Sequence, residues 1–304
     1  MKANPLVTVN ILSFNRKKDL VDTIRHVLDQ DYKNIEIIVV DNASNDGTQR
    51  MLNSEYPQVK LVSLNKNVGI SAWNHGVDES LGEYILFLDD DSYPESGAIA
   101  SGVKALQDNE SVGVVGYKIF NSHLKIVENK EGLEFYKKNN YSLGFIGCGA
   151  IIRKELFVRL NGFNKNIFLY HHEYDFSARV YNAGYKVVLI DDAEVVHNYS
   201  KKNRGQKSRG NVVDERKYYY SFISLAVFQI QNFSLRFKLV YIPKLLVSRF
   251  YIAARLGLMG SYFRALLQIL KYLIEFKYDI RPLQPEIQRL YGNGNIKFND
   301  INEF

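Results

Sequence analysis

Cysteine is almost absent from this chain of 304 residues, in which Cys148 is the only one. A single cysteine excludes an internal disulfide framework and any zinc site that needs several thiolates. Structural disulfides are characteristic of oxidising compartments, so their absence favours a reducing one. Because glycines flank Cys148, we expect it to be a small packed side chain and not a nucleophile.

Apolar runs that would make good membrane spans are missing as well. Residues 218–235 carry no charge, but their Ser, Gln and Asn side chains make them a poor span. The N-terminal sequence MKANP runs directly into a strand pattern without the apolar core of a signal peptide. We therefore expect a cytoplasmic protein that is not exported by that route.

Acidic residues are scarce toward the C-terminus. Residues 201–281 contain 16 Lys and Arg against 4 Asp and Glu, a balance of +12, whereas the whole chain carries +6. These basic residues alternate with Leu, Ile, Phe and Tyr in helical patterns, which suits an anionic membrane surface better than a nucleic acid. The sequence contains no recognised nucleic-acid-binding motif, and we expect no nucleic-acid partner.

Strand and helix patterns alternate along the first two thirds of the chain. The predicted strands cover residues 6–12, 35–40, 59–64, 84–88, 112–120, 185–190 and 194–197. The predicted helices cover residues 17–30, 70–81, 97–106, 154–161 and 171–184, and one more begins near residue 46. Such alternation predicts an α/β fold with right-handed βαβ units in a mostly parallel sheet.

Three consecutive carboxylates, residues 89–91, follow the apolar run at 84–88. That run is typical of a strand buried on both faces, and open α/β sheets bind ligands at the carboxyl ends of their strands. Polar segments at 13–16 and 41–48 follow two other strands, so three loops should converge on one edge of the sheet. Carboxylate oxygens suit Mg²⁺ or Mn²⁺, which predicts a ligand site there.

Structural explanations exist for the same residues. The acidic cluster could be a solvated turn, and Asp41 and Asp46 could be turn or cap residues, since such positions favour Asp. His197 follows two valines and could be an ordinary histidine at the end of a strand. The sequence alone leaves these alternatives open.

Seven motifs together resemble the family 2 glycosyltransferases, nucleotide-sugar-dependent enzymes of GT-A fold, and especially their bacterial rhamnosyltransferase-like branch. In chain order they are SFNR, DNASNDGT, NVGISAWNHG, YILFLDDD, GFIGCGAIIR, HHEYDFSAR and VVH. They cover approximately residues 5–200. The resemblance implies a GT-A catalytic domain at 1–205 that holds the nucleotide-sugar and acceptor sites, followed by a helical region at 206–304.

The resemblance also implies a role for each residue that matches a motif. The residues expected to bind the nucleotide sugar are Ser13, Asn15, Arg16, Asp41, Asn42, Asn67, Gly69, Asn74, Asp89 and Asp90. Among them, Asp41 would meet the nucleobase and Asp89 would lie near the ribose. Asp91 would bind Mn²⁺ or Mg²⁺ that bridges the donor diphosphate, and His197 would be a further metal ligand or contact the diphosphate.

Family members use an acidic residue at the start of the helix after the glycine-rich segment as general base. Glu173 occupies that place here, with Asp175 as the second candidate. The family often has two adjacent acids before a third, whereas this sequence has His172 before Glu173. Asp175 and Arg179 are four residues apart on a predicted helix and could instead form an intrahelical ion pair.

The predicted activity is a metal-dependent, inverting transfer of a sugar to a hydroxyl of a glycan or lipid-linked acceptor in bacterial cell-surface polysaccharide synthesis. UDP-sugars and dTDP-rhamnose are both possible donors. A nucleotide-sugar-binding scaffold without catalysis is the alternative. A nucleotidyltransferase is disfavoured because the first turn has no P-loop signature.

The basic C-terminal region predicts helices that lie on a surface. One apolar, aromatic helix is expected at 218–230, and residues 233–277 should form helices broken near Pro243 and at 257–260. Their apolar and basic residues would either bind the inner leaflet of the cell membrane or pair two chains in a homodimer. The polar segment 201–210 is expected to be a loop that closes over the site, or a linker.

Overall fold

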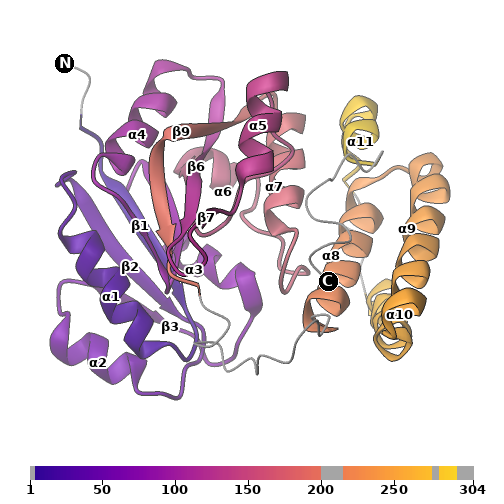
Figure 1. Cartoon of the computed structure of the whole chain (residues 1–304), viewed down its shortest axis with the longest axis horizontal. Helices are drawn as coiled ribbons and strands as arrows, with labels where there is room; N and C mark the ends of the chain where they lie inside the picture. The colour runs from indigo at the N-terminus through magenta and orange to yellow at the C-terminus, as the bar shows by residue number, and fades with distance from the viewer. Residues whose placement is uncertain (1–3, 200–214, 276–280, 293–304) are drawn as a thin grey trace.

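The computed structural model describes residues 4–199, 215–275 and 281–292 of the chain (Figure 1). In this part of the chain, strands form one sheet with the order β3-β2-β1-β4-β8-β6-β9-β5, and β7 pairs with β6. The strands are β1 (Val7–Ser13), β2 (Ile35–Asp41), β3 (Lys60–Ser63), β4 (Tyr84–Asp89), β5 (Ser92–Pro94), β6 (Val112–Asn121), β7 (Ile126–Val127), β8 (Ala150–Arg153) and β9 (Lys186–His197).

Helices connect many of these strands and follow the last one. The helices are α1 (Lys17–Leu28), α2 (Thr48–Glu55), α3 (Ala72–Asp78), α4 (Ala98–Asp108), α5 (Lys130–Asn139), α6 (Lys154–Arg159), α7 (His172–Asn182), α8 (Glu215–Asn232), α9 (Leu235–Leu256), α10 (Met259–Glu275) and α11 (Pro285–Gly292). A short 3₁₀ turn, η1 (Gly69–Ser71), leads into α3.

The half of the sheet from β3 to β4 is parallel. β1 pairs with both β2 and β4, and β2 pairs with β3. β8 lies antiparallel between β4 and β6, while β6 and β9 are parallel. The predicted α/β fold with a mostly parallel sheet is confirmed. Because β1, β2 and β4 run in the same direction, the loops that follow them lie along one edge.

Helices cover both faces of the sheet. Successive side chains of a strand point to opposite faces, and apolar side chains on each face pack against helices. On β4, Leu86 and Leu88 belong to a core shared with α1, α2 and α4. Ile85 and Phe87 belong to a second core, shared with α3, α6 and α7. The strand is therefore apolar from Tyr84 to Leu88, before its final residue Asp89, as expected for a strand covered on both sides.

Helices α8 and α11 pack against α7, which lies between the sheet and the C-terminal helices (Figure 1). Helices α9 and α10 pack against α8. Tyr174 and Ala178 of α7 join a third core with Tyr291 of α11. The Tyr174 hydroxyl donates to the Tyr291 carbonyl oxygen at 2.6 Å, and Asn232 at the end of α8 donates to the buried Asp175 carboxylate at 3.0 Å. The predicted helical region is confirmed, and it shares a core with α7.

One predicted helix break is confirmed and another is wrong. α9 ends at Gly257, whose φ of 72° is a left-handed conformation that favours glycine. Pro243, in contrast, lies inside α9 without ending it. The lost backbone hydrogen bond is offset by tertiary packing of the residues on one side of the helix. These buried residues are Tyr241, Leu245, Arg249 and Ala253.

The two strand segments predicted at 185–190 and 194–197 are one strand, β9. Asp191 and Asp192 interrupt its apolar pattern because both are exposed at the middle of the strand, where Asp191 forms an ion pair with Lys137 of α5. β5, β7, α5 and α11 were not predicted, since they are too short or too polar to show a clear period.

The segment 201–210 and the predicted domain boundary at residue 205 lie outside the described residues. No helix in the described part of the chain combines the length and the apolar character that a membrane span requires.

Replacing Asn232 by Asp tests the junction between α7 and α8. The new carboxylate would lie beside the buried Asp175 carboxylate, so we expect the free energy of unfolding to fall by about 3–5 kcal/mol. Chemical denaturation would measure the change. Asn53 is exposed on α2, and Asn53→Asp is the matched control, with an expected effect below about 0.5 kcal/mol. Equal effects of the two substitutions would contradict a shared core.

Candidate functional site

The predicted convergence of three loops is observed at the carboxyl ends of β1, β2 and β4. Ser13 lies opposite Asp41 in the pairing of β1 with β2, and Leu12 lies opposite Asp89 in the pairing of β1 with β4. Sheet register therefore brings together residues that are up to 76 positions apart in the sequence, as in the hydrogen bond from Phe14 N to Asp90.

The first two loops are fastened to each other by hydrogen bonds. The Asn15 backbone N–H donates to Ser44 Oγ at 2.8 Å, and Asn15 Oδ1 accepts from the Asn45 N–H at 2.8 Å. The Asp46 carboxylate accepts from the Lys17 N–H at 2.8 Å and from Thr48. Asp46 is thus the turn residue that one sequence interpretation expected, and it joins the start of α1 to the start of α2.

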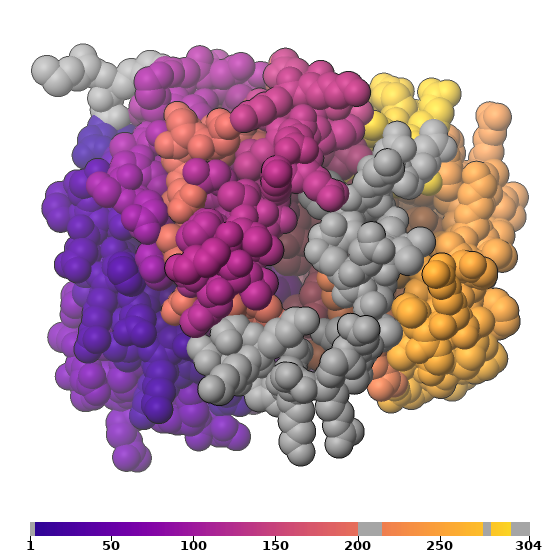
Figure 2. Space-filling view, viewed as in Figure 1, coloured from indigo at the N-terminus to yellow at the C-terminus, as the bar shows by residue number. Residues whose placement is uncertain are grey.

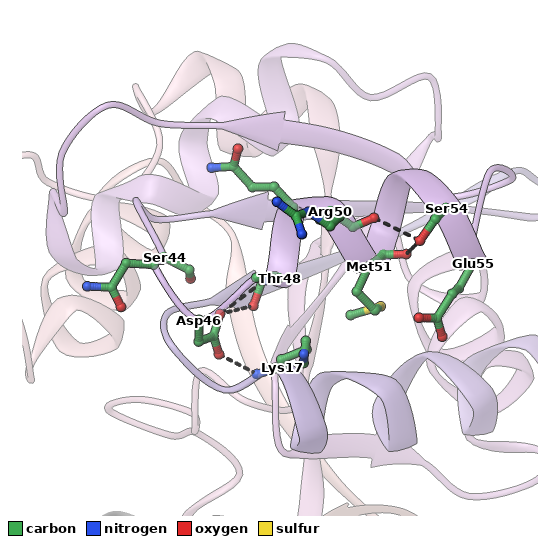
Figure 3. Close-up of a pocket in the computed structure, with 11 residues that line it drawn as sticks. Lys17, Ser44, Asp46, Thr48, Arg50, Met51, Ser54 and Glu55 are labelled. Atoms are coloured by element: carbon green, nitrogen blue, oxygen red, sulfur yellow. Dashed lines mark hydrogen bonds between the residues drawn. The ribbon is translucent and has the colours of Figure 1, made fainter.

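A polar pocket of about 620 Å³ opens beside these loops (Figure 3). Its lining includes Lys17, Ser44, Thr48 and Arg50. Gln49 also lines it, and its amide donates to the buried Asp41 carboxylate at 2.6 Å. Asp41 therefore lies behind the pocket lining, and Gln49 is a candidate residue that the sequence did not single out.

Asn42, Asn67 and Gly69 form a small hydrogen-bonded unit next to Asp41. The Asn42 amide donates to Asn67 Oδ1 at 3.0 Å and to the Gly69 carbonyl oxygen at 3.1 Å. Gly69 has a φ of 68°, and a Cβ at this position would overlap the Phe168 carbonyl oxygen. Glycine is required here because the backbone turns left-handed against another loop.

Asn74 is buried and points away from these loops. Its amide donates to the Phe163 carbonyl oxygen at 2.8 Å, and its Oδ1 accepts from the Phe163 N–H at 2.9 Å. Both ends of the side chain are thus used to hold the segment before α7. These contacts indicate a structural role for Asn74, whereas the family resemblance implied a residue that helps to bind the nucleotide sugar.

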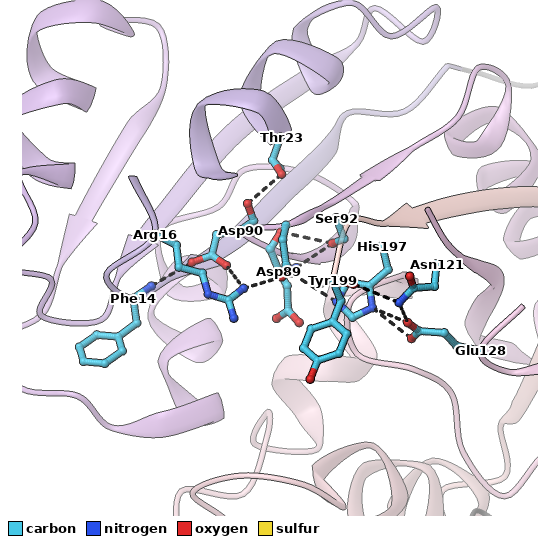
Figure 4. Close-up of polar contacts among 11 residues, drawn as sticks. Phe14, Arg16, Thr23, Asp89, Asp90, Ser92, Asn121, Glu128, His197 and Tyr199 are labelled. Atoms are coloured by element: carbon cyan, nitrogen blue, oxygen red, sulfur yellow. Dashed lines mark hydrogen bonds and ion pairs between the residues drawn. The ribbon is translucent and has the colours of Figure 1, made fainter. Parts of the chain in front are cut away.

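Arg16 neutralises two of the three consecutive carboxylates (Figure 4). Its guanidinium contacts Asp90 Oδ1 at 3.0 Å and Asp91 Oδ2 at 2.5 Å. Burial raises the pKa of Asp90 to about 7, although Arg16 acts in the opposite direction. Asp90 also accepts from the Phe14 N–H at 3.1 Å, so it faces the loop after β1.

His197 brings the end of β9 to the same cluster (Figure 4). Its Nε2 lies 3.4 Å from Asp91 Oδ1, and its Nδ1 lies 3.0 Å from Glu128. Burial disfavours the charged imidazole, but the contacts with Asp91 and Glu128 outweigh it and raise the pKa of His197 to about 10. Glu128, which itself accepts from Asn121 at 2.6 Å, orients the ring so that Nε2 faces the acids.

The donor set at this cluster fits a divalent cation. Ligand atoms of Asp89, His197 and Cys148 lie within 4.8 Å of one another, and Asp91 Oδ1 lies 3.4 Å from His197 Nε2. Burial raises the pKa of the Cys148 thiol well above its usual range, so without a bound cation it is a neutral thiol. Its soft sulfur suits neither Mn²⁺ nor Mg²⁺, which prefer oxygen ligands. Asp89, Asp91 and His197 remain. Metal binding would release the proton on His197 Nε2, and the resulting two carboxylates and neutral imidazole suit Mn²⁺ or Mg²⁺.

Glu173 projects from the first turn of α7. One of its carboxylate oxygens accepts from the Gly147 N–H at 3.2 Å, and the other lies 3.0 Å from His172 Nδ1. Burial opposes the charge on Glu173, but His172 and the Gly147 N–H outweigh it and lower its pKa. Two left-handed residues, Tyr170 and His171, precede the helix and set the direction of this turn.

Residues 147 and 148 link the two charged regions. Gly147 donates to Glu173, and Cys148 lies next to Asp89 and His197. The negative charges of Asp89 and Glu173 both act on the Cys148 thiol, which places it within electrostatic reach of each. The glycine-rich segment therefore brings Glu173 close to the acid–histidine cluster.

Asp175 is fully buried and has partners at both oxygens. Oδ2 accepts from Arg179 at 2.6 Å and 3.0 Å, and Oδ1 accepts from Asn232 at 3.0 Å. The intrahelical ion pair that the sequence left open is thus present. Of the two candidate bases, Glu173 is the more accessible: its side chain is 20% exposed, against 0% for Asp175.

Residues 8–160 of the chain match the protein family described as Glycosyl transferase family 2. The amylovoran biosynthesis glycosyltransferase AmsB of Erwinia amylovora is 27% identical over 68% of this chain and 73% of its own length. The glycosyltransferase GlyG of Streptococcus pneumoniae is 31% identical over 36% of this chain. A GalNAc(5)-diNAcBac-PP-undecaprenol beta-1,3-glucosyltransferase of Campylobacter jejuni is 34% identical over 32%. This chain spans only 38% and 33% of the last two proteins.

Solved structures share the fold at low sequence identity. A mannosyltransferase of Pyrobaculum calidifontis, in complex with GDP-Man and Mn²⁺, superposes with a TM-score of 0.58 at 20% identity over 96% of this chain and 80% of that one. TarS 1–349 of S. aureus, in complex with UDP-GlcNAc, gives a TM-score of 0.55 at 17% identity over 74% of this chain and 66% of that one. These similarities support the GT-A fold.

Asn74→Ala tests the structural role of this side chain. The substitution leaves the Phe163 N–H and carbonyl oxygen without their buried partners, so we expect a loss of about 1–3 kcal/mol in the free energy of unfolding. Denaturant titration would measure it. Asn45→Ala, at an exposed position of the second loop, is the control and should change stability by less than about 0.5 kcal/mol. An unchanged stability in Asn74→Ala would contradict the assignment.

Proposed function

Because the chain belongs to Glycosyl transferase family 2, we propose that it transfers a sugar from a nucleotide-diphosphate donor to a hydroxyl group of an acceptor. The observation that carries the proposal is the place of Gly147 and Cys148 between two charged regions. One region, Asp89, Asp91 and His197, suits a diphosphate with its cation. The other, Glu173, suits the proton of an attacking hydroxyl.

The donor is proposed to lie along the edge formed by the loops after β1, β2 and β4. The buried Asp41, held by Gln49, supplies a hydrogen-bond acceptor for a nucleobase. Asp89 is proposed to bind the ribose, and Arg16 offers a cation close to the phosphates. UDP-sugars and dTDP-rhamnose are the proposed donor classes, and the rhamnosyl specificity stays a prediction.

Asp91 and His197 are proposed to bind Mn²⁺ or Mg²⁺. Asp89 lies beside them, and it is the residue proposed to bind the ribose. When bound, such a cation stabilises negative charge on the departing nucleoside diphosphate. Glu128 keeps the His197 ring in a fixed orientation through Nδ1, which leaves Nε2 directed at the site. Arg16 compensates the charge of Asp91 as well, since it contacts Oδ2 of Asp91 while His197 contacts Oδ1.

Glu173 is proposed as the general base. Its lowered pKa means that it is ionised at neutral pH and can accept the proton of an acceptor hydroxyl as the hydroxyl attacks. Asp175 is the weaker candidate because Arg179 and Asn232 occupy its carboxylate. One base acting on an in-line attack gives a single displacement, so we propose inversion at the anomeric carbon.

The proposed acceptor is a glycan or a lipid-linked saccharide in bacterial cell-surface polysaccharide synthesis. The names of two relatives support this choice, one for amylovoran biosynthesis and one for an undecaprenol-linked substrate. A nucleotide-sugar-binding scaffold without catalysis is the competing function, and the experiment below separates the two.

A donor screen tests the activity. Release of nucleotide from UDP-, GDP- and dTDP-sugars would be followed with Mn²⁺ or Mg²⁺, alongside Glu173→Gln and Asp91→Asn. We expect metal-dependent release from one donor, a rate lower by about 10²–10⁴-fold in Glu173→Gln, and loss of the metal dependence in Asp91→Asn. Asp108→Asn, at an exposed site on α4, is the control and should keep full activity.

The outcomes distinguish the two functions. Metal-dependent nucleotide binding without release from any donor would support the scaffold. Failure to bind any nucleotide would contradict both functions.

Gly147→Ala tests the connection between Glu173 and the glycine-rich segment. A Cβ at this position would lie 2.8 Å from His172 Nε2 and 3.2 Å from Glu173 Oε1, so His172 must shift and Glu173 must yield by a few tenths of an ångström. We expect kcat to fall on the order of 100-fold, as for other small misplacements of catalytic groups. Gly144→Ala is the matched control, because no atom lies within 4 Å of its added Cβ. Equal kcat values in the two variants would refute the positioning role.

A further inference from the structure

Large apolar side chains are exposed on α9 and α10. Among the described residues, 17 large hydrophobic side chains are exposed, and 11 of them belong to these two helices. They are Leu235, Leu239, Val240, Val247, Phe250, Tyr251, Phe263, Leu267, Leu270, Leu273 and Ile274. Single exposed apolar residues are ordinary, but a concentration on two adjacent helices marks an interaction surface.

The exposed residues lie on the sides of the helices that face away from α8. On α9, Val240 and Val247 lie opposite the buried Leu245 and Arg249. On α10, residues 263, 267, 270 and 274 follow the three- and four-residue spacing of one helical stripe, and the buried Ala265 lies on the other side. Figures 1 and 2 show α9 and α10 at the end of the molecule farthest from β3 and α2.

The charge on this face has one predominant sign. α9 contains five Lys and Arg residues and no acid, and its exposed cations are Arg236, Lys244 and Arg255. Lys244 lines a shallow apolar depression on α9 together with Val247 and Tyr251. On α10 the only acid is Glu275, in the last position, where it pairs with Lys271 at 3.7 Å.

We propose that this α9–α10 face binds the surface of an anionic lipid bilayer. Exposed apolar side chains next to Lys and Arg are what a helix needs to lie at the boundary between headgroups and acyl chains. Anionic lipids complement the cations, each of which adds attraction near the surface. A two-fold dimer through the same face would instead bring the cations of one chain toward those of the other.

α8 connects this face to the candidate active site. Phe222 of α8 stacks on Tyr262 of α10 at a centroid distance of 5.5 Å. Ser221 of α8 contacts His171 Nε2 at 2.6 Å, two residues before Glu173. A bound bilayer is therefore held at a fixed place relative to Glu173. The delivery of a lipid-linked acceptor in this way rests on the proposed function, whereas lipid binding itself does not.

Vesicle sedimentation of the full chain tests the proposal. The probes are vesicles of phosphatidylglycerol with phosphatidylethanolamine, and neutral vesicles of phosphatidylcholine. The test variant carries Leu239→Glu, Val247→Glu and Leu267→Glu, at positions that are 70%, 69% and 67% exposed. The control variant carries Leu81→Glu, Leu124→Glu and Val158→Glu, at positions on other elements that are 78%, 59% and 54% exposed.

We expect the wild-type chain and the control variant to sediment with anionic vesicles, and the test variant to lose at least about tenfold in partitioning. Circular dichroism and thermal unfolding would confirm that both variants remain folded. Binding should be weaker for neutral vesicles and at high salt. Nucleotide release from a soluble donor, measured on the same variants, separates a failure of docking from a failure of the proposed catalysis.

Three results would overturn the proposal. The first is recovery of the wild-type chain in the supernatant with anionic vesicles. The second is equal sedimentation of the test and control variants. The third is a concentration-dependent dimer of the wild-type chain, measured by light scattering, that does not form in the test variant, together with no binding of the wild-type chain to vesicles. This face would then be an interface between two copies.

Discussion

The need to neutralise three consecutive carboxylates at the end of β4 constrains the rest of this structure. Burial makes each charge costly, and each acid raises the pKa of its neighbours. The compensating cations come from distant parts of the sequence: Arg16 follows β1, and His197 ends β9. The fold must therefore bring β1 and β9 to the same edge before Asp90 and Asp91 can be buried. Burial opposes the charge on Arg16, but these acids outweigh it and raise its pKa, so the guanidinium stays charged in the folded protein.

The glycine-rich segment satisfies a second constraint, which is steric. A base and a diphosphate site can serve one reaction only if they lie close together, yet Glu173 belongs to α7 and Asp89 to β4. Gly147 permits the approach because a side chain there would meet His172 and Glu173. Cys148 then continues toward Asp89, and its neutral thiol adds no charge to a site that is already strongly acidic. The sequence pattern of small residues is thus explained by close approach on two sides.

Sequence alone predicted the parallel half of the sheet and the convergence of its loops, because apolar runs followed by polar turns are local signals. It could not predict Glu128, which follows the two-residue strand β7 and meets His197 across 69 positions. That contact depends on the pairing of β6 with β9, which no local pattern specifies. Gln49 was missed for a similar reason, since its position on α2 shows no period that distinguishes it. Asn74 lies in a motif that suggests a nucleotide pocket, but only the packing of Phe163 reveals that its amide is used internally.

The same distinction between local pattern and packing applies to α9. Its sequence is apolar around most of its circumference, a pattern that predicts either a buried helix or one in contact with lipid. The structure buries one side against α8 and leaves Leu235, Leu239 and Val247 in water. If α9 only covered the core beneath it, leucine and valine on its outer side would add nothing to the stability of the fold. Because Lys and Arg are the only charged residues among these side chains, the outer surface has the chemistry of an anionic membrane interface, and α8 makes that surface part of the same rigid unit as the proposed base.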